Sequence, residues 1–90
     1  MHYVYVLKSR VDGQNYVGYT SDLKRRINEH NQGMVASTER RCPLDLIYYE
    51  ACRNMHDATK REKYLKTSYG RRYIRNRLAH DLDENEYSTG

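Results

Sequence analysis

Residues 16–30 read YVGYTSDLKRRINEH and join a strand pattern directly to a helix pattern. The opening Tyr-Val-Gly is typical of the end of a strand. At about 100° per residue, Leu23 and Ile27 mark an apolar stripe on the helix, and Arg26 and His30 fall beside it, one turn apart. The spacing therefore predicts a helix that directs an arginine and an imidazole toward a sheet, a placement that propensity and packing do not explain.

A second strand is predicted upstream of this stretch. Residues 3–7 form a β-branched and aromatic run, and residues 11–14 carry an Asp-Gly turn signal before the strand at residues 15–18. The pattern predicts a β-hairpin. On its second strand Tyr16 and Gly18 share a face, and Gly18 lets another group approach the backbone closely.

The helix that follows has recognisable ends. Thr20 and Ser21 are the N-cap candidates, and Asp22 in the first turn complements the positive helix end. We expect the helix to run to about Gln32, with Gly33 as its stop.

A polar connection at residues 34–43 is long enough to be a substrate loop. The run LDLIYYEA at residues 44–51 is the strongest strand pattern in the chain, and we expect it to be the central or the third strand of the sheet.

A second helix is predicted from Asn54 or Asp57 to about Thr67. A lone carboxylate on its inward face, Glu62, needs a partner, and a metal ion or a cationic side chain is the usual one. The residues that share this face at spacings of four, three and four are Ala58, Glu62, Leu65 and Tyr69.

Gly70 is expected to break the chain, and residues 71–79 to form a third helix with Ile74 and Leu78 inward. Between Lys60 and Arg77 there are eight basic residues and one acid, so these two helices are expected to expose a basic surface.

Ninety residues are enough for one small domain. We expect it to span residues 1–79. Residues 80–90 have little to bury and are predicted to form an acidic, disordered tail.

Charge is unevenly distributed along the chain. Residues 1–79 hold all 16 Lys and Arg against 8 acids, whereas residues 80–90 hold four acids and neither Lys nor Arg. A small domain this basic favours a polyanionic partner, nucleic acid first, because clustered cations gain affinity by releasing counterions from the phosphate backbone. Charge alone leaves a merely solvated surface as the alternative.

The first residues lack the charged start and the long apolar run of a secretion signal, and no stretch approaches the length of a membrane span. We therefore expect a cytoplasmic protein with reduced cysteines. Cys42 and Cys52 form no CxxC pair and make a weak case for zinc.

Over about its first 79 residues the chain resembles a GIY-YIG nuclease domain, most of all the short stand-alone bacterial members. The residues that carry the resemblance are Tyr3-Val4-Tyr5, Tyr16-Val17-Gly18, Arg26, His30 and Glu62. Tyr3 stands where the family has its first Gly, and Asn76 is the candidate for the family's closing Asn. The resemblance implies an α+β fold, a small three-stranded antiparallel sheet flanked by helices. This agrees with the β-β-α-β-α-α order that the pattern predicts.

The resemblance also implies a chemistry, hydrolysis of phosphodiester bonds with one Mg²⁺ or Mn²⁺ ion held by Glu62. Tyr5 would be the general base, and Tyr16 would hydrogen-bond the nucleophile or a phosphate oxygen. Arg26 would hold the scissile phosphate, and His30 would orient Tyr5 or relay a proton.

Each of these residues also has an ordinary structural interpretation. Glu62 would then be paired with a neighbouring Lys or Arg, and Arg26 with a strand acid such as Glu50. The two tyrosines would be sheet aromatics, and His30 a hydrogen-bonded core residue. Contacts to backbone phosphates are predicted for Lys24, Arg25, Arg40, Arg41, Lys60, Arg61, Arg71 and Arg72.

The sequence therefore predicts a metal-dependent DNA endonuclease, with selectivity for DNA structure in repair or recombination as one option. RNA stays open as a substrate, and a protein partner is one way to supply specificity. The first alternative is a non-catalytic nucleic-acid-binding module of the same fold. The second is a protein-binding adaptor, which the acidic tail favours.

Overall fold

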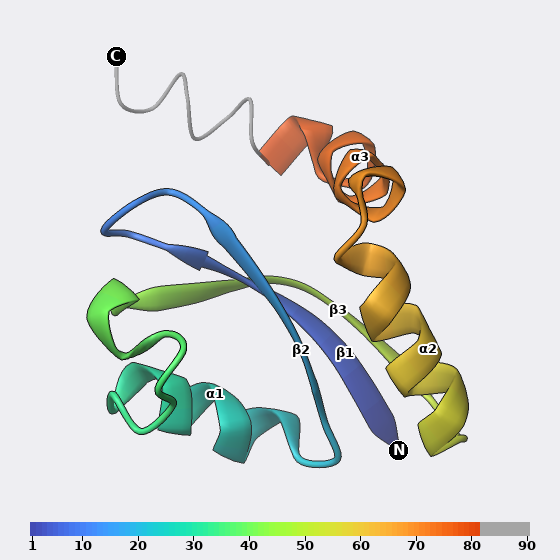
Figure 1. Ribbon diagram of the computed structural model, residues 1–90, viewed down its shortest axis with the longest axis horizontal. Coiled ribbons are helices and arrows are strands. Elements are labelled where there is room, and N and C mark those ends of the chain that lie inside the picture. Colours follow the sequence, from blue (N-terminus) through green and yellow to red (C-terminus); the bar gives the residue numbers. More distant parts are fainter. Residues whose placement is uncertain (82–90) are drawn as a thin grey trace.

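The three strands form one antiparallel sheet in the order β2-β1-β3 (Figure 1). The computed structural model describes residues 1–81, so most of the predicted acidic tail lies outside the described residues. The strands are β1 (His2–Ser9), β2 (Asn15–Thr20) and β3 (Leu44–Cys52). Together with the helices they confirm the predicted α+β fold and its hairpin. No helix within residues 1–81 has the length and apolar character that a membrane crossing requires.

The central strand is β1, which pairs with both neighbours. Its residues Val4, Tyr5, Val6 and Leu7 are each no more than 1% exposed, because helices cover both faces of the sheet at this strand. Of the two positions expected for residues 44–51, the structure has the third strand, at an edge.

An irregularity in β3 explains why its apolar residues do not alternate strictly. Val6 pairs with Tyr48 and Leu7 pairs with Leu46, so Ile47 is an extra residue in the ladder. As a result Ile47 and Tyr48 both pack against the same apolar cluster.

Helices cover the two faces of the sheet differently (Figure 1). The α1 face is covered by α1 (Leu23–Asn31), whose Leu23 and Ile27 pack near Tyr5 and Leu7. The opposite α2–α3 face is covered by α2 (Met55–Leu65) and α3 (Ser68–Arg77). Its buried cluster consists of Val4, Val6, Ala58, Leu65 and Ile74.

The start of α1 differs from the prediction by one or two residues. Asp22, not Thr20 or Ser21, is the N-cap, and its side chain accepts a hydrogen bond from the Arg25 amide. Thr20 is occupied instead with the amide of Asp22. The predicted end is confirmed, since the helix stops at Asn31 and Gly33 takes a φ of 74°.

The boundary between α2 and α3 was predicted wrongly. The break falls at residues 66–67, where the Thr67 side chain caps α3 by accepting a hydrogen bond from the Gly70 amide. Gly70 lies inside α3. Glycine is required there because a Cβ would overlap the backbone of Leu65 and the carbonyl oxygen of Tyr64. Tyr69 therefore belongs to α3 and is 70% exposed rather than inward.

Candidate active site

The side chain of Tyr5 passes over the neighbouring strand at Gly18. The two residues are direct partners in the β1–β2 ladder. A Cβ at Gly18 would overlap the Cζ and Oη atoms of Tyr5, so only glycine leaves room for the phenol ring. The close approach predicted for Gly18 is thus made by the ring of Tyr5, and it carries the hydroxyl toward the β2 side of the sheet.

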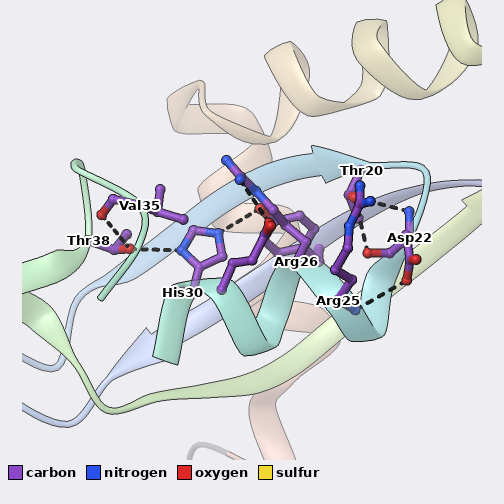
Figure 2. Close-up of polar contacts among 9 residues, drawn as sticks. Thr20, Asp22, Arg25, Arg26, His30, Val35 and Thr38 are labelled. Carbon is purple, nitrogen blue, oxygen red and sulfur yellow. Dashed lines mark hydrogen bonds and ion pairs between the residues drawn. The ribbon is translucent and has the colours of Figure 1, made fainter. Parts of the chain in front are cut away.

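His30 receives this hydroxyl from the helix side. Its Nε2 atom lies 2.8 Å from the Tyr5 Oη, and its Nδ1 atom lies 2.8 Å from the Thr38 Oγ1. Figure 2 shows His30 on α1 with Thr38 beyond it in the loop. His30 and Thr38 are fully buried. A charged or badly oriented ring would be costly there, so these contacts fix the imidazole in one orientation.

The donor and acceptor of each hydrogen bond follow from Thr38, the last side chain in the series. The Thr38 hydroxyl donates to the carbonyl oxygen of Val35, at 3.5 Å, and so it is free to accept from the His30 Nδ1–H. The Nε2 atom of His30 then has a lone pair for the Tyr5 hydroxyl. A hydrogen-bonded line therefore runs from Tyr5 through His30 and Thr38 to the backbone.

Burial and charge set the protonation states of this line. Burial raises the pKa of Tyr5 to about 12, and the Arg26 guanidinium beside the hydroxyl opposes that rise. Burial also lowers the pKa of His30, and the positive charge of Arg26 adds to this. At neutral pH the site accordingly holds a neutral phenol and a neutral imidazole next to a fixed cation.

Arg26 is the cation beside the Tyr5 hydroxyl. The hydrogen bond to the Tyr5 hydroxyl is the largest cause of the raised pKa of the Arg26 guanidinium. Its ion-pair partner is Glu29 at 3.3 Å, one turn along α1, and not Glu50, which pairs with Arg61. The side chain of Arg26 is 37% exposed, so the guanidinium is open to an anion from solvent.

Tyr16 completes an aromatic cluster with these residues. Its ring centroid lies 5.1 Å from that of His30 and 6.5 Å from that of Tyr5. The Tyr16 hydroxyl has no hydrogen-bond partner in the described part of the chain, so it is available to a ligand.

Glu62 reaches the same region from α2. Its negative charge contributes to the raised pKa of Tyr5. The carboxylate is paired with Lys66 at 2.9 Å, and the two side chains are 21% and 52% exposed. Within residues 1–81 no group of three or more His, Cys, Asp or Glu residues gathers to hold a metal ion. A single, partly exposed carboxylate still fits Mg²⁺, which keeps several waters and takes phosphate oxygens as ligands.

Comparison with known proteins agrees with this geometry. Residues 1–76 match the family model of the GIY-YIG catalytic domain. The chain belongs to the GIY-YIG family. The match confirms the resemblance predicted from the two tripeptides and the three residues that follow them.

The similar proteins are short bacterial proteins named UPF0213. One from Clostridium perfringens is 43% identical over 67 residues, which cover 73% of this chain and 71% of the relative. One from Staphylococcus saprophyticus is 42% identical over 67 residues, or 73% of this chain and 80% of the relative. The solution NMR structure of a UPF0213 protein from Bacillus halodurans superimposes with a TM-score of 0.52 at 33% identity, and covers 81% of this chain and 80% of that one. The name UPF0213 states no activity.

Thr38 is the residue of this GIY-YIG site that sequence reasoning missed. It was expected only as one polar residue in the connection at residues 34–43, and no local pattern distinguishes it. The connection is not a free loop, because Val35 and Thr38 are buried and a short 3₁₀ helix, η1 (Glu39–Arg41), follows them. The Asn31 side chain fixes its far end by bonding both the amide and the carbonyl of Leu44.

The basic residues predicted to contact phosphates fall into two groups. Arg41 and Arg61 have partners within the fold: Arg41 pairs with Asp12 at 2.9 Å, and Arg61 pairs with Glu50 at 3.0 Å. The guanidinium of Arg61 also lies over the ring of Tyr73, 4.7 Å from its centroid. The residues that stay exposed, with no ion pair in the part of the chain that the structure describes, are Lys24, Arg25, Arg40, Lys60, Arg71 and Arg72.

Proposed function

We propose that this GIY-YIG domain is a metal-dependent endonuclease that hydrolyses phosphodiester bonds in DNA. One observation carries the proposal: the Tyr5 hydroxyl lies between a proton acceptor, the neutral His30, and a fixed cation, Arg26. A phenol placed in this way can take a proton on one side while it releases one on the other.

The proton transfer must pass through Tyr5 rather than start from its phenolate. With a pKa of about 12, only about one molecule in 10⁵ carries the phenolate at pH 7. We infer that the attacking water forms the new P–O bond while its proton moves to the Tyr5 oxygen. The Tyr5 proton moves to His30 at the same time. The P–O bond to the leaving oxygen then breaks, and that oxygen takes a proton from solvent.

Other residues of the site take the remaining tasks. Arg26 binds the scissile phosphate and stabilises the negative charge that develops on it. Tyr16 donates a hydrogen bond to a phosphate oxygen. A Mg²⁺ or Mn²⁺ ion held by Glu62 would supply further positive charge to offset the negative charge of the transition state. The exposed basic side chains bind the flanking backbone without reading bases.

A non-catalytic nucleic-acid-binding module is the second candidate. The ion pair between Glu62 and Lys66 favours it, because that pair satisfies the carboxylate without a metal ion. The protein-binding adaptor predicts no salt-sensitive binding of nucleic acid, and the exposed cations argue against it. Under either nucleic-acid hypothesis we place the protein in the cytoplasm. A role in repair or recombination and a partner that supplies specificity belong to the nuclease proposal.

A cleavage experiment separates the two candidates. Wild type, Tyr5→Phe and Glu62→Ala are incubated with single-stranded, duplex, flapped and branched DNA and with RNA, in Mg²⁺, Mn²⁺ or chelator. We expect metal-dependent nicking by wild type that both variants lose. Lys66→Ala is the matched control, since it breaks the same ion pair as Glu62→Ala but keeps the carboxylate. Binding of the panel without cleavage under any metal would support the binding module instead.

A further inference from the structure

A hollow lies on the α1 face, and neither Tyr5 nor His30 lines it. It has a volume of about 620 Å³ and lies between α1 and the β3 edge of the sheet. Its apolar walls come from Tyr3, Ile27, Leu46 and Tyr49, and its polar rim includes Lys24 and Asn28. The volume falls in the range of small-molecule sites, about 300–1,000 Å³. None of the residues assigned to catalysis lines it.

Helix α1 separates this hollow from the proposed catalytic groups. Lys24, Ile27 and Asn28 lie on one flank of the helix, whereas Arg26 and His30 lie on the other, by the angular spacing of 100° per residue. In the sheet, Tyr5 pairs with Tyr49 on one side and with Gly18 on the other. Because the ring of Tyr5 lies over Gly18, it leaves the β3 side of the face to Tyr49.

The aromatic wall of the hollow is accessible. Tyr49 is 52% exposed and Leu46 is 38% exposed, although both lie on a strand. The ring centroids of Tyr3 and Tyr49 are 6.2 Å apart, and the ring planes meet at 59°. Within residues 1–81 the Tyr49 ring therefore has no parallel ring partner, and a flat aromatic group can stack on it.

The polar rim matches a nucleotide. Lys24 is exposed and has no ion pair in the structure of residues 1–81, and the exposed Asn28 amide offers both a donor and an acceptor. Asp22 also lines the hollow, but its carboxylate is occupied as the helix cap. Arg25 adds a second exposed cation beside Lys24. An anionic ligand with a flat ring fits this combination better than an apolar peptide does.

We propose that the hollow binds an unpaired base of the nucleic acid substrate, stacked on Tyr49, while Lys24 contacts its phosphate. This rests on the proposed function, and it narrows the substrate class to nucleic acids with an unpaired nucleotide close to the scissile bond. A base inside a duplex is stacked between its two neighbours and paired with the opposite strand, so it cannot enter the hollow. Tyr3 lines the hollow and lies two residues from Tyr5 on β1, so the hollow is a close neighbour of the proposed catalytic groups.

The test measures binding in chelator, so that it does not depend on cleavage. Fluorescence anisotropy gives the affinity for a short single-stranded oligonucleotide and for its duplex, with wild type, Tyr49→Ala, Tyr49→Phe and Lys24→Ala. Tyr69→Ala is the matched control, because Tyr69 is an exposed tyrosine on the opposite face of the sheet. A 2-aminopurine base in the oligonucleotide reports stacking by loss of its fluorescence.

We expect Tyr49→Ala to weaken single-strand binding by about tenfold, with duplex binding changed less than about twofold. Tyr49→Phe should keep the affinity and the quenching, and Lys24→Ala should weaken single-strand binding by a smaller factor. Equal losses on both substrates, or no loss for Tyr49→Ala, would overturn the proposal. If wild type cuts nothing but Tyr49 still controls single-strand affinity, the pocket stands and the nuclease proposal fails.

Discussion

The two faces of the sheet differ in what they bury. On the α2–α3 face the buried cluster is entirely aliphatic, from Val4 and Val6 to Leu65 and Ile74. On the α1 face a phenol, an imidazole and a threonine hydroxyl are buried together and bonded to one another. Burial of these aliphatic side chains contributes to stability through the hydrophobic effect. The chemical role that we propose for the other face rests on these polar groups, which are buried at a cost beside the partly exposed Arg26.

The largest contrast in activity is expected from Tyr5→Phe. This change keeps the ring that packs over Gly18 but removes the atom through which a proton passes. We expect the cleavage rate to fall by about 10²–10⁴-fold. The free energy of unfolding should fall by only about 1–3 kcal/mol, the cost of one lost hydrogen bond and an unpaired His30 nitrogen. Single-turnover kinetics and urea denaturation measure the two effects, and a rate within tenfold of wild type would contradict the proposed relay.

The opposite face should give the reverse result with Leu65→Ala. Leu65 is 1% exposed and lies in the aliphatic cluster, so its truncation should lower the free energy of unfolding by about 2–5 kcal/mol. At a temperature where the variant is fully folded, its cleavage rate should stay within about twofold of wild type. Denaturation curves and rates measured at the same temperature check both statements. A rate loss as large as that of Tyr5→Phe would mean that the α2–α3 face contributes to cleavage as well as to stability.

Local signals were sufficient for most of the fold. The Asp-Gly turn, the stripe of Leu23 and Ile27 and the stop at Gly33 each depend on neighbours in the chain, and the structure confirms all three. Gly70 was misjudged because its reason is a contact with the backbone of the preceding helix. A glycine at a helix crossing and a glycine at a helix end look the same in one sequence.

The site could be predicted only as far as its residues resemble the family pattern. The contact between Tyr5 and His30 joins residues 25 positions apart. No spacing rule gives that pairing, and Thr38 had no signal because a hydroxyl in a polar connection is ordinary. The extra residue at Ile47 was equally hidden, because a bulge is set by the partner strand.

The pH dependence of stability should distinguish His30 from an exposed histidine. Burial lowers the pKa of His30 in the folded protein, so the unfolded chain binds its proton at a higher pH than the folded one does. Stability due to a neutral His30 is complete above the unfolded pKa of about 6.5 and is lost as the pH falls through the lowered folded pKa. His30→Gln should flatten this part of the curve. His56→Gln, on the exposed part of α2, should leave it unchanged.

Urea denaturation at several pH values between about 4 and 8 measures this effect. In the same range the proposed relay requires neutral His30 as the proton acceptor, so the cleavage rate of wild type should fall together with stability on acidification. If the slope persists in His30→Gln, another buried group is responsible for it.

The smallest effect is expected at the connection between the two faces, where Glu62 of α2 influences Tyr5 of β1. Lys66 occupies the carboxylate in the absence of a metal ion, and an exposed pair of this kind contributes about 0.3–0.5 kcal/mol. Lys66→Ala should therefore strengthen Mg²⁺ binding by about twofold, which calorimetric titration of the protein alone can measure. Lys63→Ala removes an equal charge from the exposed side of the same helix without breaking this pair. If both variants bind Mg²⁺ equally well, the gain is due to the overall charge and Lys66 does not compete for Glu62. If only Lys66→Ala binds Mg²⁺ more tightly, Glu62 is the carboxylate that holds the ion.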